Sequence, residues 1–166
     1  MCIRDSTKAI QRAIDAATLV RDDNALVGDR IFFPAGVYRV TSTLLIDETV
    51  GLHMVGAGPM STTLMWDPGP LPTSDELVDP LDEPETEAQG PVFLIQDVAD
   101  STFEEFGIST AKGKVLSSAI RMESMGGENV EMKANVFRKM IIDGGEAGVK
   151  RGVRIAIGVP NEDDEY

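Results

Sequence analysis

Residues 29–66 decide how this chain folds, and they read DRIFFPAGVYRVTSTLLIDETVGLHMVGAGPMSTTLMW. The stretch is a series of short apolar segments separated by turns, at residues 31–33, 37–40, 44–46, 50–55 and 63–66. Residues 50–55 alternate in the way typical of a strand with one buried face. Segments this short and this closely spaced leave no room for a helix in each connection. They predict a chain that winds on itself through short strands and turns.

Three motifs occur in a fixed order between residues 5 and 66. They are DST at 5–7, FPAGVYRV at 33–40, and a strand at 52–58 that ends in GAG. In order and spacing, the chain resembles the N-terminal part of pectate-lyase-like, right-handed parallel β-helix proteins. The resemblance implies an all-β solenoid, a right-handed single-stranded parallel β-helix with an N-terminal capping α-helix. Residues 5–166 would then be the N-terminal part of one β-helix domain.

The capping helix is expected within residues 5–20. Its apolar residues recur at helical spacing, at Ile10, Ala13, Ile14 and Ala17. Ser6 is the predicted N-cap and Thr7 the alternative, and the helix should run to about Val20. Because the first coil of a solenoid exposes its core unless something covers it, we expect Ile10 and Ile14 to pack over that coil. The expected contacts are Phe32, Val40 or Leu44.

Residues 68–91 differ from the rest of the chain. They contain six prolines and seven Asp or Glu, but no Lys or Arg. Such a segment cannot form a central strand, so it predicts a long acidic surface loop. A calcium loop is the alternative, because calcium takes several carboxylate ligands, although the acids here lack a regular spacing.

The chain after residue 91 repeats. Segments 92–95, 119–122 and 152–155 align at offsets of 27 and 33, and 103–108 aligns with 137–142 at an offset of 34. We also align Met54 with Ile108 once the acidic loop is set aside. Irregular periods near thirty fit three to four β-helix coils. The alignment predicts that two sets of side chains stack inward: Phe93, Ile120 and Val153, and Phe106 and Met140.

The same alignment bears on catalysis. It places Glu104 opposite Arg138, Glu105 opposite Lys139, and Ser109 opposite Asp143. Glycoside hydrolysis needs two carboxyl groups at a set separation, about 5–5.5 Å or 6.5–9.5 Å. These alignments predict salt bridges between coils instead of carboxylate pairs, so no catalytic residues are assigned. Should the chain prove active, the first residues to mutate are Asp97, Asp143 and His53.

Two further residues have alternative interpretations. His53 is the single histidine, and its place in the alternation puts it on the outer face of its strand, where a surface residue is favoured over a catalytic base. Trp66 is either a platform for stacking a sugar ring or a residue that packs beneath the acidic loop.

Charge and composition limit the partners. A formal net charge of −13 argues against nucleic acid or an anionic membrane. The first residues contain no secretory signal, and no apolar run is long enough to span a membrane. The chain stops shortly after a strand without a closing cap, so we expect a C-terminally truncated fragment.

The resemblance implies carbohydrate-active relatives, namely polysaccharide lyases, polygalacturonase-like hydrolases and epimerases. We therefore expect the N-terminal segment of such an enzyme, inactive by itself, with a polysaccharide or cell-surface glycan as partner. The alternative is a non-catalytic glycan-binding β-helix such as a phage tail spike or surface fibre, which would be a homotrimer. Either implies an extracellular or virion-surface location. No cofactor is evident, and calcium remains open for the full-length protein.

Overall fold

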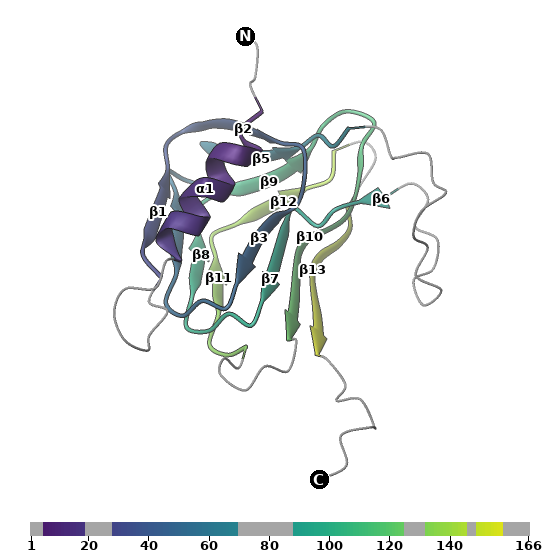
Figure 1. Ribbon diagram of the computed structural model, residues 1–166. Coiled ribbons are helices and arrows are strands. Elements are labelled where there is room, and N and C mark those ends of the chain that lie inside the picture. Colours follow the sequence, from purple (N-terminus) through teal and green to yellow (C-terminus); the bar gives the residue numbers. More distant parts are fainter. Residues whose placement is uncertain (1–4, 19–27, 70–87, 125–131, 146–148, 158–166) are drawn as a thin grey trace, which may run out of the picture.

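The computed structural model describes residues 5–18, 28–69, 88–124, 132–145 and 149–157, which contain one helix and thirteen strands (Figure 1). The helix is α1 (Thr7–Ala17). The strands are β1 (Arg30–Phe33), β2 (Gly36–Val40), β3 (Leu44–Asp47), β4 (His53–Gly56), β5 (Thr62–Trp66), β6 (Ala88–Gln89), β7 (Phe93–Gln96), β8 (Thr102–Glu104), β9 (Gly107–Thr110), β10 (Val115–Ser124), β11 (Val136–Arg138), β12 (Ile141–Asp143) and β13 (Val149–Ile157).

The strands form three parallel sheets. The first sheet is β1-β4-β8-β11, the second is β2-β5-β9-β12, and the third is β3-β7-β10-β13, with β6 also paired to β10. Consecutive strands belong to different sheets, and every third main strand returns to the sheet where the coil began. The described residues thus make four coils of a parallel β-helix with an N-terminal helix, which confirms the predicted fold class.

The strand register confirms the repeats after residue 91. Ile120 pairs with Phe93 on one side and with Val153 on the other, and Phe103 pairs with Phe137. The alignment of Met54 with Ile108 was wrong, because Met54 pairs with Phe103 and Ile108 pairs with Leu64.

Two differences in connection length explain that error. Residues 57–61 separate β4 from β5, whereas residues 105–106 alone separate β8 from β9. The predicted loop at 68–91 is also shorter at its end than expected, since β6 at residues 88–89 already pairs with β10. For this reason no single sequence offset aligns all the strands of the second coil with those of the third.

The core lies inside the three sheets because alternate residues of each strand point inward. Aromatic side chains line much of it. The rings of Phe103 and Phe137 stack at 5.0 Å between centroids, and Phe106 contacts both Phe33 and Phe93. Phe93, Ile120 and Phe106 are buried, and Met140 packs against the core from a partly buried position, so these four residues of the two predicted inward sets lie where expected.

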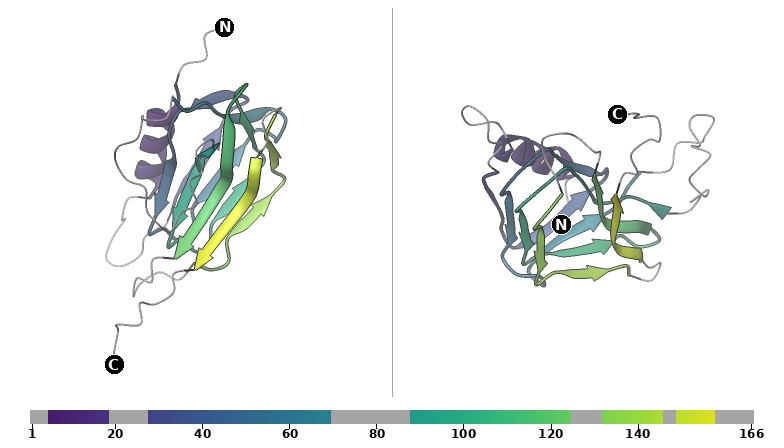
Figure 2. Two further views of the ribbon diagram at one scale, coloured as in Figure 1. Left: turned by 90° about the vertical axis from the view of Figure 1, so that its right-hand side faces the viewer. Right: turned by 90° about the horizontal axis from the view of Figure 1, so that it is seen from below.

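Helix α1 closes one end of the stack. Ile10, Ile14 and Ala17 belong to the same core as Val40 and Leu44. Phe32 does not contact this helix face as predicted, because Ile31 and Phe33 take the inward positions of β1 and leave Phe32 exposed. In Figure 2, α1 and β13 lie at opposite ends of the stack. The helix ends at Ala17, earlier than the predicted Val20, and residues 19 and 20 lie outside the described residues.

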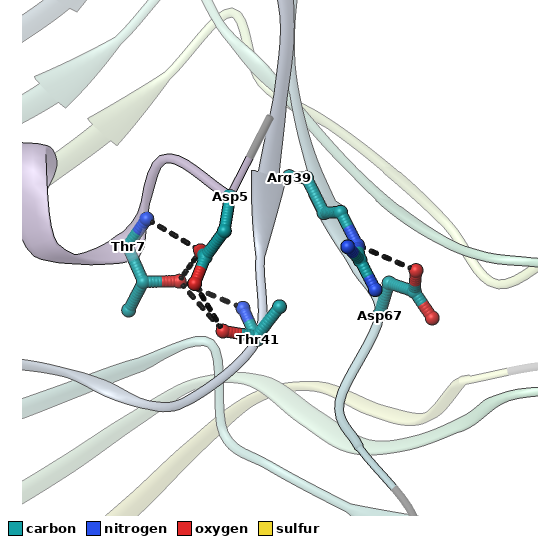
Figure 3. A network of polar contacts seen from close by, with 5 residues as sticks. All are labelled: Asp5, Thr7, Arg39, Thr41 and Asp67. Carbon is teal, nitrogen blue, oxygen red and sulfur yellow. Dashed lines mark hydrogen bonds and ion pairs between the residues drawn. The ribbon is translucent and has the colours of Figure 1, made fainter. Parts of the chain in front are cut away.

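A polar network joins the start of α1 to the first coil (Figure 3). The Asp5 carboxylate accepts hydrogen bonds from the Thr7 backbone at 2.9 Å, the Thr7 hydroxyl at 2.6 Å and the Thr41 hydroxyl at 3.0 Å. These bonds, from Thr7 first, lower the pKa of Asp5 below its ordinary value. Ser6 occupies the N-cap position but makes no side-chain cap bond, so Asp5 performs the capping that the sequence assigned to Ser6.

The helix also satisfies the backbone edge of the first coil. The Gln11 side chain donates to the Leu45 carbonyl and accepts from the Leu45 amide, each at 2.9 Å. The Ser6 amide donates to the Arg39 carbonyl at 2.8 Å. Edge strands expose unpaired donors and acceptors, and here α1 and the residues before it occupy several of them.

The opposite end is uncovered in the part of the chain that the structure describes. Val153 and Ile155 occupy the same inward rows as Phe93 and Ile95, which are fully buried. Yet Val153 is 44% exposed and Ile155 is 64% exposed. The predicted stacking of Val153 on Ile120 is confirmed, but its burial is not, because no strand lies beyond β13 in the described residues.

Candidate functional site

A row of polar side chains crosses the outer face of the third sheet. Asp47, Gln96 and Glu123 are in register on neighbouring strands, and they alternate with the inward residues. We call these three residues the acidic row. Because neighbouring strands lie about 4.8 Å apart, the Cα atoms of Asp47 and Glu123 are separated by about 9.6 Å.

The two carboxylates of the acidic row have different surroundings. Glu123 accepts a hydrogen bond from Gln96 Nε2 at 3.3 Å and forms an ion pair with Arg121. Asp47 is exposed. The row offers fixed acceptors and donors to a ligand with many hydroxyl groups. It does not offer two carboxylates that are both free to move a proton, since Glu123 would first have to leave its ion pair.

A second cluster lies on the outer face of the first sheet. Glu104 Oε1 lies 2.7 Å from His53 Nε2, and Glu104 Oε2 accepts from Arg138 Nε at 2.5 Å. The hydrogen bond from Arg138, followed by that from His53, lowers the pKa of Glu104 to about 2. In turn, Glu104 raises the pKa of Arg138. The carboxylate is therefore held ionised, which suits a structural link between three coils and excludes a proton donor.

The predicted salt bridges between coils are present. Arg138 pairs with Glu104, and Lys139 Nζ lies 2.6 Å from Glu105 Oε1. Ser109 is in register with Asp143, as predicted. His53 lies on the outer face as expected, but it is a half-buried partner of Glu104 and not a plain surface residue.

The three residues chosen for mutation do not meet. His53 is on the first sheet, Asp143 is on the second, and Asp97 directly follows β7 of the third. Asp97 is buried and accepts a hydrogen bond from the Ser124 hydroxyl at 3.2 Å. Asp143 is exposed and accepts one from the Gly145 amide at 2.9 Å. Each of these two acids stabilises a local turn or strand end.

Trp66 is a core residue. It is buried on β5 among the apolar side chains of the interior. The inward alternation of Thr62, Leu64 and Trp66 explains why, because every second residue of a strand faces the same way. The sugar-stacking interpretation of Trp66 is therefore wrong.

Metal and membrane predictions are only partly covered by the structure. Among the described residues, no three His, Cys, Asp or Glu side chains are grouped so that they could hold a metal ion. The calcium-loop alternative falls mostly on residues 70–87, outside the described residues. None of the helical residues that the structure describes forms a segment long and apolar enough to cross a membrane.

Sequence reasoning missed the acidic row, although a signal was present. Extending the aligned segments 92–95 and 119–122 by one residue places Gln96 opposite Glu123. Asp47 was missed because the first coil had not been aligned with the later ones. The link from His53 to Glu104 was missed because the second coil was aligned with the third through Met54 and Ile108, whereas Met54 pairs with Phe103.

Comparison with known proteins agrees with this architecture. A model of the family described as rhamnogalacturonase A/epimerase, pectate lyase-like, matches residues 3–160. No curated protein matches the chain, and no solved structure does. The match covers nearly all of the chain and the whole described β-helix. The chain therefore belongs to the rhamnogalacturonase A/epimerase family of pectate lyase-like proteins, a carbohydrate-active kind of β-helix.

Proposed function

We propose that this chain is the N-terminal part of a polysaccharide lyase or glycoside hydrolase, that it binds glycan along the acidic row, and that it cleaves no glycosidic bond by itself. Family membership supports the glycan ligand. The observation that carries the proposal is the pairing of outward carboxylates with cations. Glu104, Glu105 and Glu123 each form an ion pair with an arginine or lysine.

We infer the absence of cleavage by comparing what the chemistry requires with what the acidic row offers. Hydrolysis needs two placed carboxyl groups, and elimination needs a base beside a uronate carboxylate together with a cation. In the acidic row Asp47 faces solvent, but Glu123 is engaged by Arg121 and Gln96. Among the described residues, the row thus presents one available carboxylate where hydrolysis requires two.

The distribution of exposed apolar residues favours this proposal over a trimeric fibre. Phe32, Val37 and Leu45 of the first coil are exposed, and they lie on the first, second and third sheets respectively. Packing of three copies along one face would require a contiguous apolar surface. The exposed apolar residues of this coil are instead spread around its outline.

No described strand covers the inward side chains of β13, which supports the assignment to an N-terminal part. Val153 and Ile155 continue the buried rows of the core, and a further coil stacked on β13 would bury them. A family member with additional coils would also have more outer-face positions for catalytic carboxylates.

The experiment separates binding from cleavage. The purified 166-residue chain is incubated with a panel of uronate and neutral polysaccharides, and reducing ends and unsaturated products are followed over time. We expect no products, but retardation of the chain in gels containing a bound polysaccharide. Asp47→Asn should reduce the retardation, whereas Asp143→Asn, a matched change on the second sheet, should not. Turnover by the chain would refute the claim that it is inactive, and equal retardation of both variants would refute binding at the acidic row.

A further inference from the structure

The outer face of the first sheet carries two parallel rows of side chains. One row consists of Arg30, His53, Thr102 and the exposed Val136, and the other consists of Phe32, Val55, Glu104 and Arg138. We call these eight residues the first-sheet face. It lies on a different sheet from the acidic row, so the two surfaces can be altered separately.

In the second row, the side chains at the two ends are exposed and those in the middle are buried. Phe32 is 56% exposed and the Arg138 side chain is 60% exposed. Between them Val55 is buried and the Glu104 side chain is 9% exposed. Three strand spacings separate β1 from β11, so the Cα atoms of Phe32 and Arg138 lie about 14 Å apart. A ligand that contacts both must be an extended molecule several rings long.

The charge of the first-sheet face is opposite to that of the whole chain. The chain has a formal net charge of −13 with its histidine counted as neutral, whereas on the same count this face carries two arginines against one glutamate. Both oxygens of that glutamate are occupied, one by His53 and the other by Arg138. An approaching anion therefore meets cations and a neutralised carboxylate. Such a local field attracts anionic ligands in particular.

The hydrogen bond to Glu104 also leaves Arg138 available to a ligand. Arg138 donates through Nε, and among the described residues its terminal amino groups have no partner. A guanidinium fixed in this way presents a planar pair of donors, which matches the geometry of a second carboxylate. The Thr102 hydroxyl, which makes no hydrogen bond within the described residues, lies on the neighbouring row and can bind a sugar hydroxyl.

We propose that the first-sheet face is a second binding surface, for a short acidic oligosaccharide. Phe32 packs against the apolar face of one sugar ring, and Arg138 pairs with the carboxylate of a ring further along. Thr102 and His53 contact hydroxyl groups between them. This inference rests on the proposed function in that the ligand is a glycan, but it assigns different residues on a different sheet.

The chemistry of the surface favours an acidic glycan over other anions. A nucleic acid would bring many phosphates against a strongly acidic protein, which opposes association. A small inorganic anion would use Arg138 and have no need of Phe32. A ligand that combines an apolar ring face, hydroxyl groups and a carboxylate uses all parts of the first-sheet face at once.

The test uses a tetramer of α-1,4-linked galacturonic acid as the probe and the same tetramer with its carboxyls methyl-esterified as the control ligand. Binding to the 166-residue chain is measured by calorimetry at low salt. The affected residues are mapped by amide chemical shifts on the unaltered protein. We expect shifts at His53, Thr102 and Arg138, and tighter binding of the acidic tetramer than of its ester. The mapping needs no variant and so does not depend on whether a mutant folds.

Substitutions then separate the two surfaces. Arg138→Gln should weaken binding of the acidic tetramer by about 10-fold or more, since a charge-assisted hydrogen bond is lost. Phe32→Ala should weaken it by about 2–10-fold through loss of ring contact. Matched controls are Lys139→Gln, which removes the adjacent cation, and Leu45→Ala, which removes an exposed apolar side chain from the third sheet. Neither control should change the affinity, and melting curves confirm that each variant is folded.

Each outcome decides between the surfaces. One outcome is that Asp47→Asn and Glu123→Gln abolish tetramer binding while Phe32→Ala and Arg138→Gln leave it unchanged. Binding at the first-sheet face is then refuted, and binding at the acidic row is supported. If the ester binds as tightly as the acid, or if no shift appears at the first-sheet face, the inference is also refuted. Weaker binding in Phe32→Ala and Arg138→Gln supports the inference, whether or not Asp47→Asn and Glu123→Gln also weaken it.

Discussion

Replacing Ile14 of α1 by alanine should destabilise the whole β-helix, because this side chain is part of the core that the helix covers. Ile14 is almost completely buried, together with Ile10 and Ala17, against the inward residues of the first coil. If α1 is the lid of the solenoid core, removing part of its buried face must weaken the coils beneath it.

The size of the effect follows from the burial. Truncating a fully buried isoleucine to alanine costs about 2–5 kcal/mol, and less where the surroundings can collapse into the space. Helix α1 is held on one side only, so it can settle toward the first coil, and we expect the lower part of that range, about 2–3 kcal/mol. For a chain of this size the loss lowers the melting temperature by about 4–12 °C. Arg12→Ala, on the exposed side of the same helix, is the control and should change the free energy of unfolding by less than about 0.5 kcal/mol.

The assay is urea unfolding followed by two probes. Far-ultraviolet circular dichroism reports the backbone, and the fluorescence of Trp66 reports the core of the second coil. Both transitions should shift together in Ile14→Ala, because a single cooperative unit unfolds as one. If Ile14→Ala behaves like Arg12→Ala, or if the Trp66 transition does not move, α1 is an appendage and not a lid.

Three further outcomes can be checked on the same protein. Gly56→Ala should lower the free energy of unfolding by about 1–3 kcal/mol, because the added Cβ would lie 2.2 Å from the Glu105 carbonyl oxygen. The control is Gly36→Ala, whose Cβ would lie 3.8 Å from the nearest atom of Tyr38, and it should be tolerated in the same melting assay. The pKa of Glu104 is lowered from 4.5 to about 2, so its contribution to stability is complete above pH 4.5 and is lost as the pH falls toward 2. Melting temperatures measured across this range should therefore fall less in Glu104→Gln than in the unaltered chain. Parallel curves would contradict the stabilising role of the ionised Glu104. Replacing residues 70–87 by a short Gly/Ser linker should leave a strand-rich circular dichroism spectrum, because loop length is a weak thermodynamic term; collapse of the spectrum would show that this segment is required for folding.

Much of the fold could be predicted because strand and turn signals agree in this sequence. The pattern of Leu44, Ile46, Leu52 and Met54 places buried residues at every second position, and all four are fully buried. The offset of 34 between Phe103 and Phe137 gave the correct register and with it the pairing of Glu104 and Arg138. Local periodicity is enough where coils have similar lengths.

The prediction failed for contacts between coils whose connecting segments differ in length. Glu104 has one partner in the following coil, at a regular offset, and another, His53, in the preceding coil, beyond the acidic loop. Asp5 was overlooked as a cap because preference for serine at the N-cap position says nothing about a carboxylate one residue earlier. The acidic row required alignment of the first three coils, and their differing lengths hide it in the sequence.

The side-chain amide of Gln11 imitates a peptide group, since it offers the same donor and acceptor pair that a neighbouring strand would offer to Leu45. Sheets with bare edges recruit strands from other molecules and so seed aggregation. Because a helical residue already occupies this position, no incoming chain can pair there without displacing α1. Gln11 therefore opposes fibril growth from this edge, where the apolar residues Leu44, Leu45 and Ile46 of β3 would otherwise be open to pairing with another chain.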